Sequence, residues 1–97
     1  MDEALKAVKL AARIVTDAFD SEIKRLINAA LLDLNVAGVD GENVLLTNPL
    51  VLTAVATYVK MHFGEPDEYE RLKASYDEQK AQMSMSTGFT NWSRADG

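Results

Sequence analysis

The sequence predicts an all-α protein: a small bundle of about four helices around a central apolar helix, with an extended C-terminal arm. Apolar residues recur at spacings of three and four along several segments, which is the period of an α-helix. One segment, Asn48 to Gly64, is apolar almost all the way round, so other helices must cover it. The 97 residues of the chain suffice for one hydrophobic core.

The first two helices are predicted over Asp2–Val15 and over about Ala18–Ala37. Thr16 and Asp17, which lie between them, are residue types that favour helix caps, so they predict a break and a restart. Gly38 can take the left-handed conformation that ends a helix. We therefore expect two amphipathic helices joined by a short turn.

The central helix is predicted to begin at Asn48, an N-cap residue, with Pro49 in the first helical position, where its missing N–H has no helical partner anyway. Gly64 is expected to end it. The preceding stretch, Val39–Thr47, contains the Asp-Gly pair of a turn. We expect this stretch to be a connector that folds its apolar residues back onto the core.

A last helix is predicted over Pro66–Met83, with a narrow apolar seam. Residues 84–97 are rich in Ser, Thr, Gly and Asn. The expected organisation is a helical domain over 1–83 and an extended or flexible C-terminal arm over 84–97. The residues expected to form the structural core are Phe19, Ile23, Leu26, Ile27, Leu34, Leu52, Val55, Val59, Phe63, Tyr69, Leu72 and Tyr76.

Composition excludes several classes of protein. The chain has 10 basic and 15 acidic side chains and a formal net charge of −5, which argues against a dedicated nucleic-acid binder. The absence of cysteine excludes disulfides and thiolate metal sites and is consistent with a reducing compartment. The longest apolar region, Pro49 to Phe63, is shorter than the roughly 20 residues of a membrane span. We expect a soluble protein with no membrane partner.

No pattern of catalysis or metal binding is present in the sequence. His62 is the one histidine, and its place in the last turn of a helix favours interaction with the helix dipole over catalysis. Asp67, Glu68 and Glu70 match the positive start of a helix better than they match a metal cluster. We therefore expect no enzyme activity, no catalytic residues, no metal and no cofactor.

Three basic residues form a stripe on the first predicted helix. Lys6, Lys9 and Arg13 recur at spacings of three and four, opposite the apolar face. One interpretation is a solvated face, which is the more common outcome. The other is a contact for an acidic protein or for the DNA backbone.

Two aromatic residues, Phe89 and Trp92, lie in the polar C-terminal arm. They either pack against their own domain or anchor the arm on a partner or a neighbouring copy, because aromatic side chains dominate interface hot spots. The sequence favours neither alternative.

The chain resembles the head–tail connector family of tailed bacteriophages, also called head-completion proteins or DNA-packaging adaptors. The resemblance covers about Asp17 to Ser86. Its components are the DAFDSEIKRLINAALLDLNVAGV stripe, the NPL helix start, a histidine-aromatic-glycine corner, and a Tyr-bearing helix that runs into MSMS. No single component is specific, whereas the ordered set is considerably more so.

This resemblance implies a structural virion protein with no catalytic motif. Copies would form a homo-oligomeric ring beneath the portal protein, extend the DNA channel and join a tail-side connector or tail-completion protein. DNA would pass through the channel without sequence-specific binding. The protein would be made in the host cytoplasm and would reside at the head–tail junction of the virion.

Two other classes stay open from the sequence. A small acidic helical regulator, or an antitoxin-like protein-binding module, would have a similar length and composition. It would bind one partner and form no ring. A small acidic enzyme is the weakest alternative.

Overall fold

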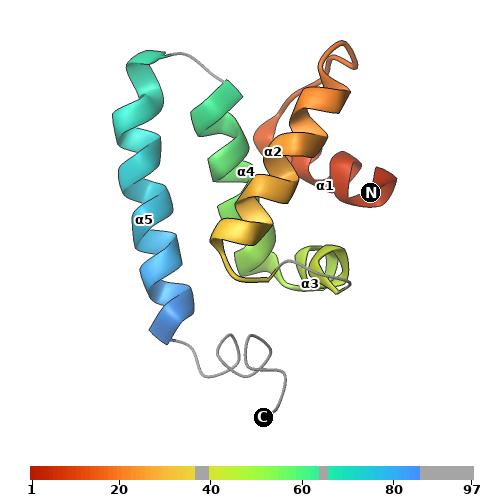
Figure 1. Cartoon of the computed structure of the whole chain (residues 1–97). Helices are drawn as coiled ribbons and strands as arrows, with labels where there is room; N and C mark the ends of the chain where they lie inside the picture. Colours follow the sequence, from red (N-terminus) through yellow and green to blue (C-terminus); the bar gives the residue numbers. More distant parts are fainter. Residues whose placement is uncertain (37–39, 64–65, 86–97) are drawn as a thin grey trace.

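The computed structural model describes residues 1–36, 40–63 and 66–85. Within this part of the chain the fold is entirely helical (Figure 1), and the predicted all-α class is confirmed. The elements are α1 (Asp2–Ala12), α2 (Asp20–Asp33), α3 (Gly41–Thr47), α4 (Pro49–Phe63), the 3-10 turn η1 (Pro66–Glu68) and α5 (Tyr69–Met85).

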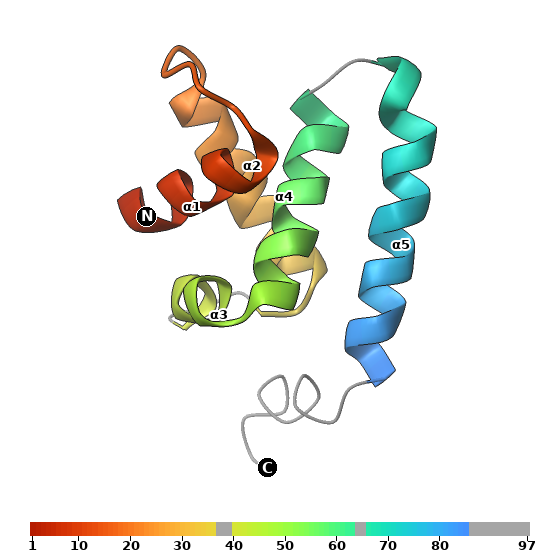
Figure 2. The ribbon, with the colours of Figure 1, turned by 180° about the vertical axis from the view of Figure 1, so that it is seen from behind.

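Helix α4 is the centre of the fold. It lies between α5 on one side and α1 and α2 on the other, and α3 crosses near its start (Figures 1 and 2). Val51, Val55 and Val59 are completely buried. The buried Thr57 keeps its hydroxyl satisfied by donating to the carbonyl of Thr53 at 2.9 Å. The apolar surface of α4 is therefore covered by helices on several sides, as its sequence requires.

Helix α4 begins as predicted, with Asn48 as the N-cap and Pro49 as the first helical residue. The side-chain Oδ1 of Asn48 accepts hydrogen bonds from the backbone N–H groups of Leu50 at 3.0 Å and Val51 at 3.4 Å. Asn48 itself is extended, as expected of a residue before proline. This break separates α3 from α4 by a bend of 106°, and no single helix in the described ranges is long and apolar enough to cross a membrane.

Helix α1 is shorter than predicted. It ends at Ala12 and not at Val15, because Arg13 adopts a left-handed conformation with φ of 61°. The N–H of Ile14 then bonds to the carbonyl of Lys9 at 2.9 Å, a pattern typical of a Schellman helix end. Val15 therefore lies in the segment between α1 and α2, where it is 96% exposed.

Helix α2 is also shorter than the predicted Ala18–Ala37. The same type of helix end occurs at Asn35, with φ of 61°, and the N–H of Val36 bonds to the carbonyl of Leu31 at 3.0 Å. Asparagine tolerates the left-handed region better than most residues because its short side chain bonds locally. Asn35 thus takes the role expected of Gly38, which lies outside the described residues.

The expected connector Val39–Thr47 contains a helix that is not predicted from the sequence. Helix α3 occupies Gly41–Thr47, and Leu45 is completely buried. The inward folding of this apolar stretch was anticipated, whereas its helical form was not. Seven residues give two helical turns, too few for a clear periodic pattern.

The core joins residues from all five α-helices. Among the residues expected there, Ile23, Ile27, Val55, Val59, Leu72 and Tyr76 are buried, and Leu26, Leu34, Leu52, Phe63 and Tyr69 are partly buried against them. Phe19 is the exception and is 48% exposed. It precedes the first turn of α2 with non-helical backbone angles, so it is not aligned with the buried stripe of that helix. Its ring meets the edge of Phe63 with centroids 5.3 Å apart.

Candidate interaction surfaces

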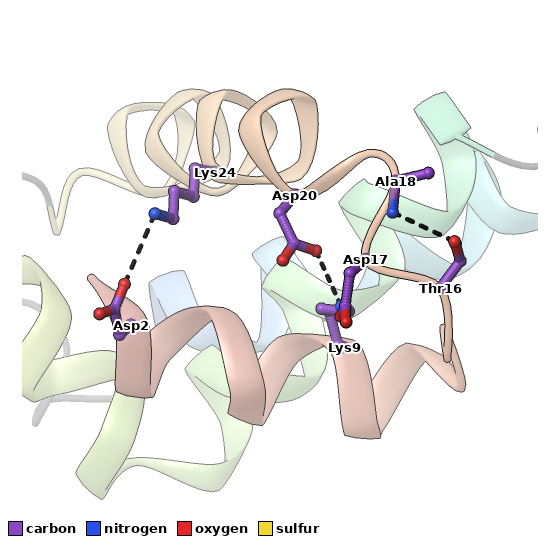
Figure 3. Close-up of polar contacts among 7 residues, drawn as sticks. All are labelled: Asp2, Lys9, Thr16, Asp17, Ala18, Asp20 and Lys24. Carbon is purple, nitrogen blue, oxygen red and sulfur yellow. Dashed lines mark hydrogen bonds and ion pairs between the residues drawn. The ribbon is translucent and has the colours of Figure 1, made fainter.

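The middle residue of the predicted basic stripe is part of an internal polar clasp. Lys9 Nζ donates to Oδ1 of Asp17 and to Oδ1 of Asp20, both at 2.8 Å (Figure 3). Its side chain is only 11% exposed. The clasp fastens α1 to the segment that leads into α2 and to the first residue of α2. A second, longer pair, Lys24 with Asp2 at 3.5 Å, joins the same two helices.

The electrostatics of this clasp are mutually reinforcing. Hydrogen bonds to Asp17 and then to Asp20 raise the pKa of the Lys9 ammonium, and the Lys9 bond in turn lowers the pKa of the Asp17 carboxyl. The segment is ordered further by Thr16, whose hydroxyl accepts the N–H of Ala18 at 3.1 Å. Lys9 is therefore held in polar contacts within its own chain.

The other two residues of the stripe remain on the surface. Lys6 and Arg13 are exposed, and within the described ranges neither forms an ion pair. The clasp separates Lys9 from the two exposed cations of the stripe, and a partner contact at the three residues stays a prediction. Arg13 also borders an apolar surface.

That apolar surface surrounds the end of α1. Leu10 is 81% exposed and Val15 is 96% exposed, although such side chains favour burial. Together with Lys9, Arg13 and Ile14 they line an open hollow of about 420 Å³. We call these five residues the α1-end hollow. Exposed apolar side chains gathered beside a cation are typical of a protein interaction surface.

A second polar cluster joins α5 to the end of α2. The hydroxyl of Tyr76 donates to Oδ2 of Asp33 at 2.6 Å, and Lys80 Nζ lies 3.0 Å from the same oxygen. The Lys80 ammonium also lies 5.7 Å from the centre of the Tyr76 ring. The Tyr76 hydroxyl and then Lys80 hold the pKa of the Asp33 carboxyl below its usual value. Burial, followed by Asp33, raises the pKa of Tyr76.

Aromatic rings line the junction of α4 and α5. Tyr58 contacts the edge of Tyr76 with centroids 5.4 Å apart, and it also lies 4.4 Å from the ring of His62. His62 in turn meets Tyr69 at 6.0 Å. His62 therefore packs among tyrosines at the end of α4. Among the described residues, the His62 side chain forms no hydrogen bond and no ion pair, and its ring contacts are with Tyr58 and Tyr69.

The acidic side chains of α2 and α5 differ in how many of them form ion pairs or hydrogen bonds within the protein. On α2, Asp20 is bound by Lys9 and Asp33 by Tyr76 and Lys80, which leaves Glu22 without an ion pair among the described residues. On α5, Glu70 and Glu78 are exposed and have no described ion pair. Among the described residues, α5 thus has two carboxylates without an ion pair, whereas α2 has one.

Several predicted or possible sites lie elsewhere or outside the described residues. Phe89 and Trp92 fall within residues 86–97, which are outside the described part of the chain. Among the described residues there is no group of three or more His, Cys, Asp or Glu that could hold a metal ion. The helical domain expected to end at Met83 continues as α5 to Met85.

Sequence reasoning missed the two polar clusters and the α1-end hollow. Asp33 and Tyr76 are 43 positions apart, and no local pattern predicts that they meet. The hollow depends on the early end of α1 at Arg13, an arginine in a conformation that its residue type disfavours. The signal that was available is the pair of cap-forming residues at Thr16 and Asp17, which does mark the turn.

The comparison with protein families gives a match along most of the chain. The sequence model of the phage connector protein family matches residues 4–90. Neither a curated protein nor a solved structure matches the chain. The chain belongs to the phage connector protein family. It is accordingly a structural connector of the virion at the head–tail junction, where it contacts other head or tail proteins.

Proposed function

We propose that copies of this chain form a ring beneath the portal, complete the head, extend the DNA channel and provide the surface on which the tail assembles. The observation that carries this proposal is the family match across residues 4–90. The partners are the portal protein on one side and a tail-side connector or tail-completion protein on the other. The chain is made in the host cytoplasm and acts without catalytic residues or a cofactor.

The charge of the chain supports a channel role. A net charge of −5 opposes adhesion of DNA, because the phosphate backbone is itself densely negative. Within the fold, α5 packs against α4 and presents Glu70 and Glu78 to solvent. We assign the outer face of α5 to the wall of the channel, since most acidic residues of α2 are held in internal contacts.

The ring itself is tested by adding the purified chain to heads that carry a portal and lack this protein. Sedimentation of the heads, followed by mass measurement of the bound material, should find several copies at each portal vertex. Absence of binding, or a single bound copy, would overturn the proposed ring. A free dimer that binds DNA or a toxin would favour the regulator class instead.

The channel assignment is tested with a double variant, Glu70→Gln with Glu78→Gln. Phage assembled with this variant should eject DNA more slowly, because removal of the repelling charge allows the phosphates to interact with the wall. Glu22→Gln, an exposed carboxylate on α2, is the matched control. Equal ejection rates for the double variant and the wild type would contradict the assignment of α5 to the channel wall.

A further inference from the structure

The end of α1 and the end of α5 lie on different sides of α4 (Figures 1 and 2). Helix α4 separates α5 from α1 and α2 in both views (Figures 1 and 2). The segment between α1 and α2 reaches the last residue of α4, because Phe19 contacts Phe63. Helix α5 runs back along α4 and ends beside its start (Figure 1). The end of α5 therefore lies at the opposite end of α4 from the segment between α1 and α2.

We propose that the α1-end hollow of one copy binds the C-terminal segment, residues 86–97, of a second copy, through Phe89 and Trp92. This inference rests on the proposed ring and names the contact that builds it. The segment has a polar sequence with two large aromatic residues. The hollow has exposed apolar walls at Leu10 and Val15, and the partly buried Ile14 also lines it.

The chemistry of the two surfaces is complementary. An aromatic ring that covers Leu10 and Val15 removes apolar area from water, which is favourable by about 25 cal/mol for each Å². Arg13 at the border of the hollow has no ion pair among the described residues and can lie over the face of an indole. Lys9 is already neutralised by two carboxylates, so binding in the hollow does not bury an uncompensated ammonium.

The geometry favours a second copy over the same chain. Trp92 is seven positions beyond Met85 in the sequence, and seven residue steps span at most about 25 Å when fully extended. To reach its own hollow, the segment has to cover most of the roughly 22 Å length of α4 and also pass to the other face of the bundle. A neighbouring copy can present its hollow directly beside the end of α5.

A contact of this kind has the symmetry that a ring needs. The donor segment and the acceptor hollow are different surfaces of one chain, so the interface is heterologous. Such contacts repeat from copy to copy and close when the rotation between neighbours divides a full turn. A symmetric dimer would form instead if two copies exchanged their segments reciprocally, each segment occupying the hollow of the other copy.

The test uses the absence of cysteine from the natural chain. Full-length Val15→Cys and full-length Thr90→Cys chains are mixed on portal-bearing heads under mild oxidation. A disulfide needs Cα atoms within about 7 Å, so docking should give roughly tenfold or more cross-linked dimer than the control pair, through the high effective concentration of a bound segment. The control pairs Thr90→Cys with Leu32→Cys, an exposed leucine on α2.

The outcomes separate this inference from the proposed function. Binding of all variants to the heads with no excess of the 15–90 cross-link would overturn the inference and leave the ring standing. A 15–90 bond that forms only within a single chain carrying both cysteines would also overturn it. If no variant and no wild-type chain binds the heads, the proposed function fails and this inference fails with it.

A second measurement protects the test against misfolded variants. Trp92 is the single tryptophan, so its emission reports its own environment. On assembly the emission of the wild type should shift to shorter wavelength, and Leu10→Asp should abolish the shift while the far-ultraviolet circular dichroism stays unchanged. The control Leu32→Asp should retain the shift. Equal shifts in both variants would contradict docking in the hollow.

Discussion

The hydroxyl of Tyr76 on α5 donates a hydrogen bond to Asp33 Oδ2 on α2 at 2.6 Å, and Lys80 contacts the same oxygen at 3.0 Å. Helix α5 otherwise rests on α4 through a narrow apolar seam with Leu72, Tyr76 and Met83 buried. The polar contacts at Asp33 add a directed link between α5 and α2 to this apolar packing on α4. The bond therefore orients the helix that we assign to the channel wall.

Replacement of Tyr76 by Phe removes this bond and keeps the aromatic packing. We expect a loss of about 1 kcal/mol in the free energy of unfolding, because Asp33 stays partly solvated and keeps Lys80. For a domain of this size the midpoint of thermal unfolding falls by roughly 5 °C. Tyr58→Phe is the control, since no hydrogen bond of its hydroxyl is present among the described residues. Equal midpoints for wild type and Tyr76→Phe would show that the bond contributes nothing.

The bond between Tyr76 and Asp33 is expected to stabilise the fold over a limited range of pH. The pKa of Asp33 is lowered in the folded state, so its contribution is present above the usual value of about 4 and is lost as the pH falls through the folded value. The pKa of Tyr76 is raised, so its contribution is complete below about 10 and is lost as the pH rises further.

Urea unfolding of wild type and Tyr76→Phe at acidic, neutral and alkaline pH measures this window. The difference in unfolding free energy between the two proteins should be largest near neutrality and shrink at both extremes. A difference that is constant from pH 3 to pH 11 would contradict the coupling of the two groups.

Because Lys9 forms the clasp and Lys6 does not, we expect Lys9 to contribute more to stability than Lys6. Lys9→Met should lower the thermal midpoint, because Asp17 and Asp20 lose their shared partner while the alkyl stem is retained. Lys6→Met changes the same charge at an exposed position and should have little effect. Thermal unfolding in low and high salt measures both variants, and salt should reduce the Lys9 effect. Matching midpoints for the two variants would disprove the clasp.

We expect that replacement of Gly41 by alanine destabilises the protein. Glycine to alanine in a helix usually stabilises a protein by reducing the entropy of the unfolded chain. Here an added Cβ would lie 2.6 Å from the backbone carbonyl oxygen of Val36, so Gly41→Ala should cost about 1–3 kcal/mol through overpacking. Asn43→Ala, at an exposed position of the same helix, should not destabilise. Denaturant unfolding of both variants tests this, and a stabilised Gly41→Ala protein would refute the close approach.

The central helix was predictable because its signals are local. Asn48, an N-cap residue, and Pro49, which suits the first helical position, mark the start of this helix. Apolar residues on almost every face predict that it is buried. The ends of α1 and α2 were not predictable, since Arg13 and Asn35 carry left-handed conformations with no glycine to announce them. The Asp40-Gly41 pair marks a turn at Asp40, as predicted, but the helix that begins directly after it at Gly41 has no clear signal in the sequence.

The candidate surfaces were predictable only in part. The stripe of Lys6, Lys9 and Arg13 follows from helical spacing, but spacing cannot show that Lys9 is bound by two carboxylates across a turn. The hollow at Leu10 and Val15 arises because α1 stops one turn early. Contacts between residues distant in the sequence, such as Asp33 with Tyr76, come from tertiary packing.

A density map of the assembled head–tail junction tests the connector ring most directly. We expect several copies of the helical domain arranged in a closed ring beneath the portal, with the outer face of α5 toward the channel. It also predicts aromatic density from each C-terminal segment in the α1-end hollow of the next copy. A junction that contains no ring of this fold would contradict the account.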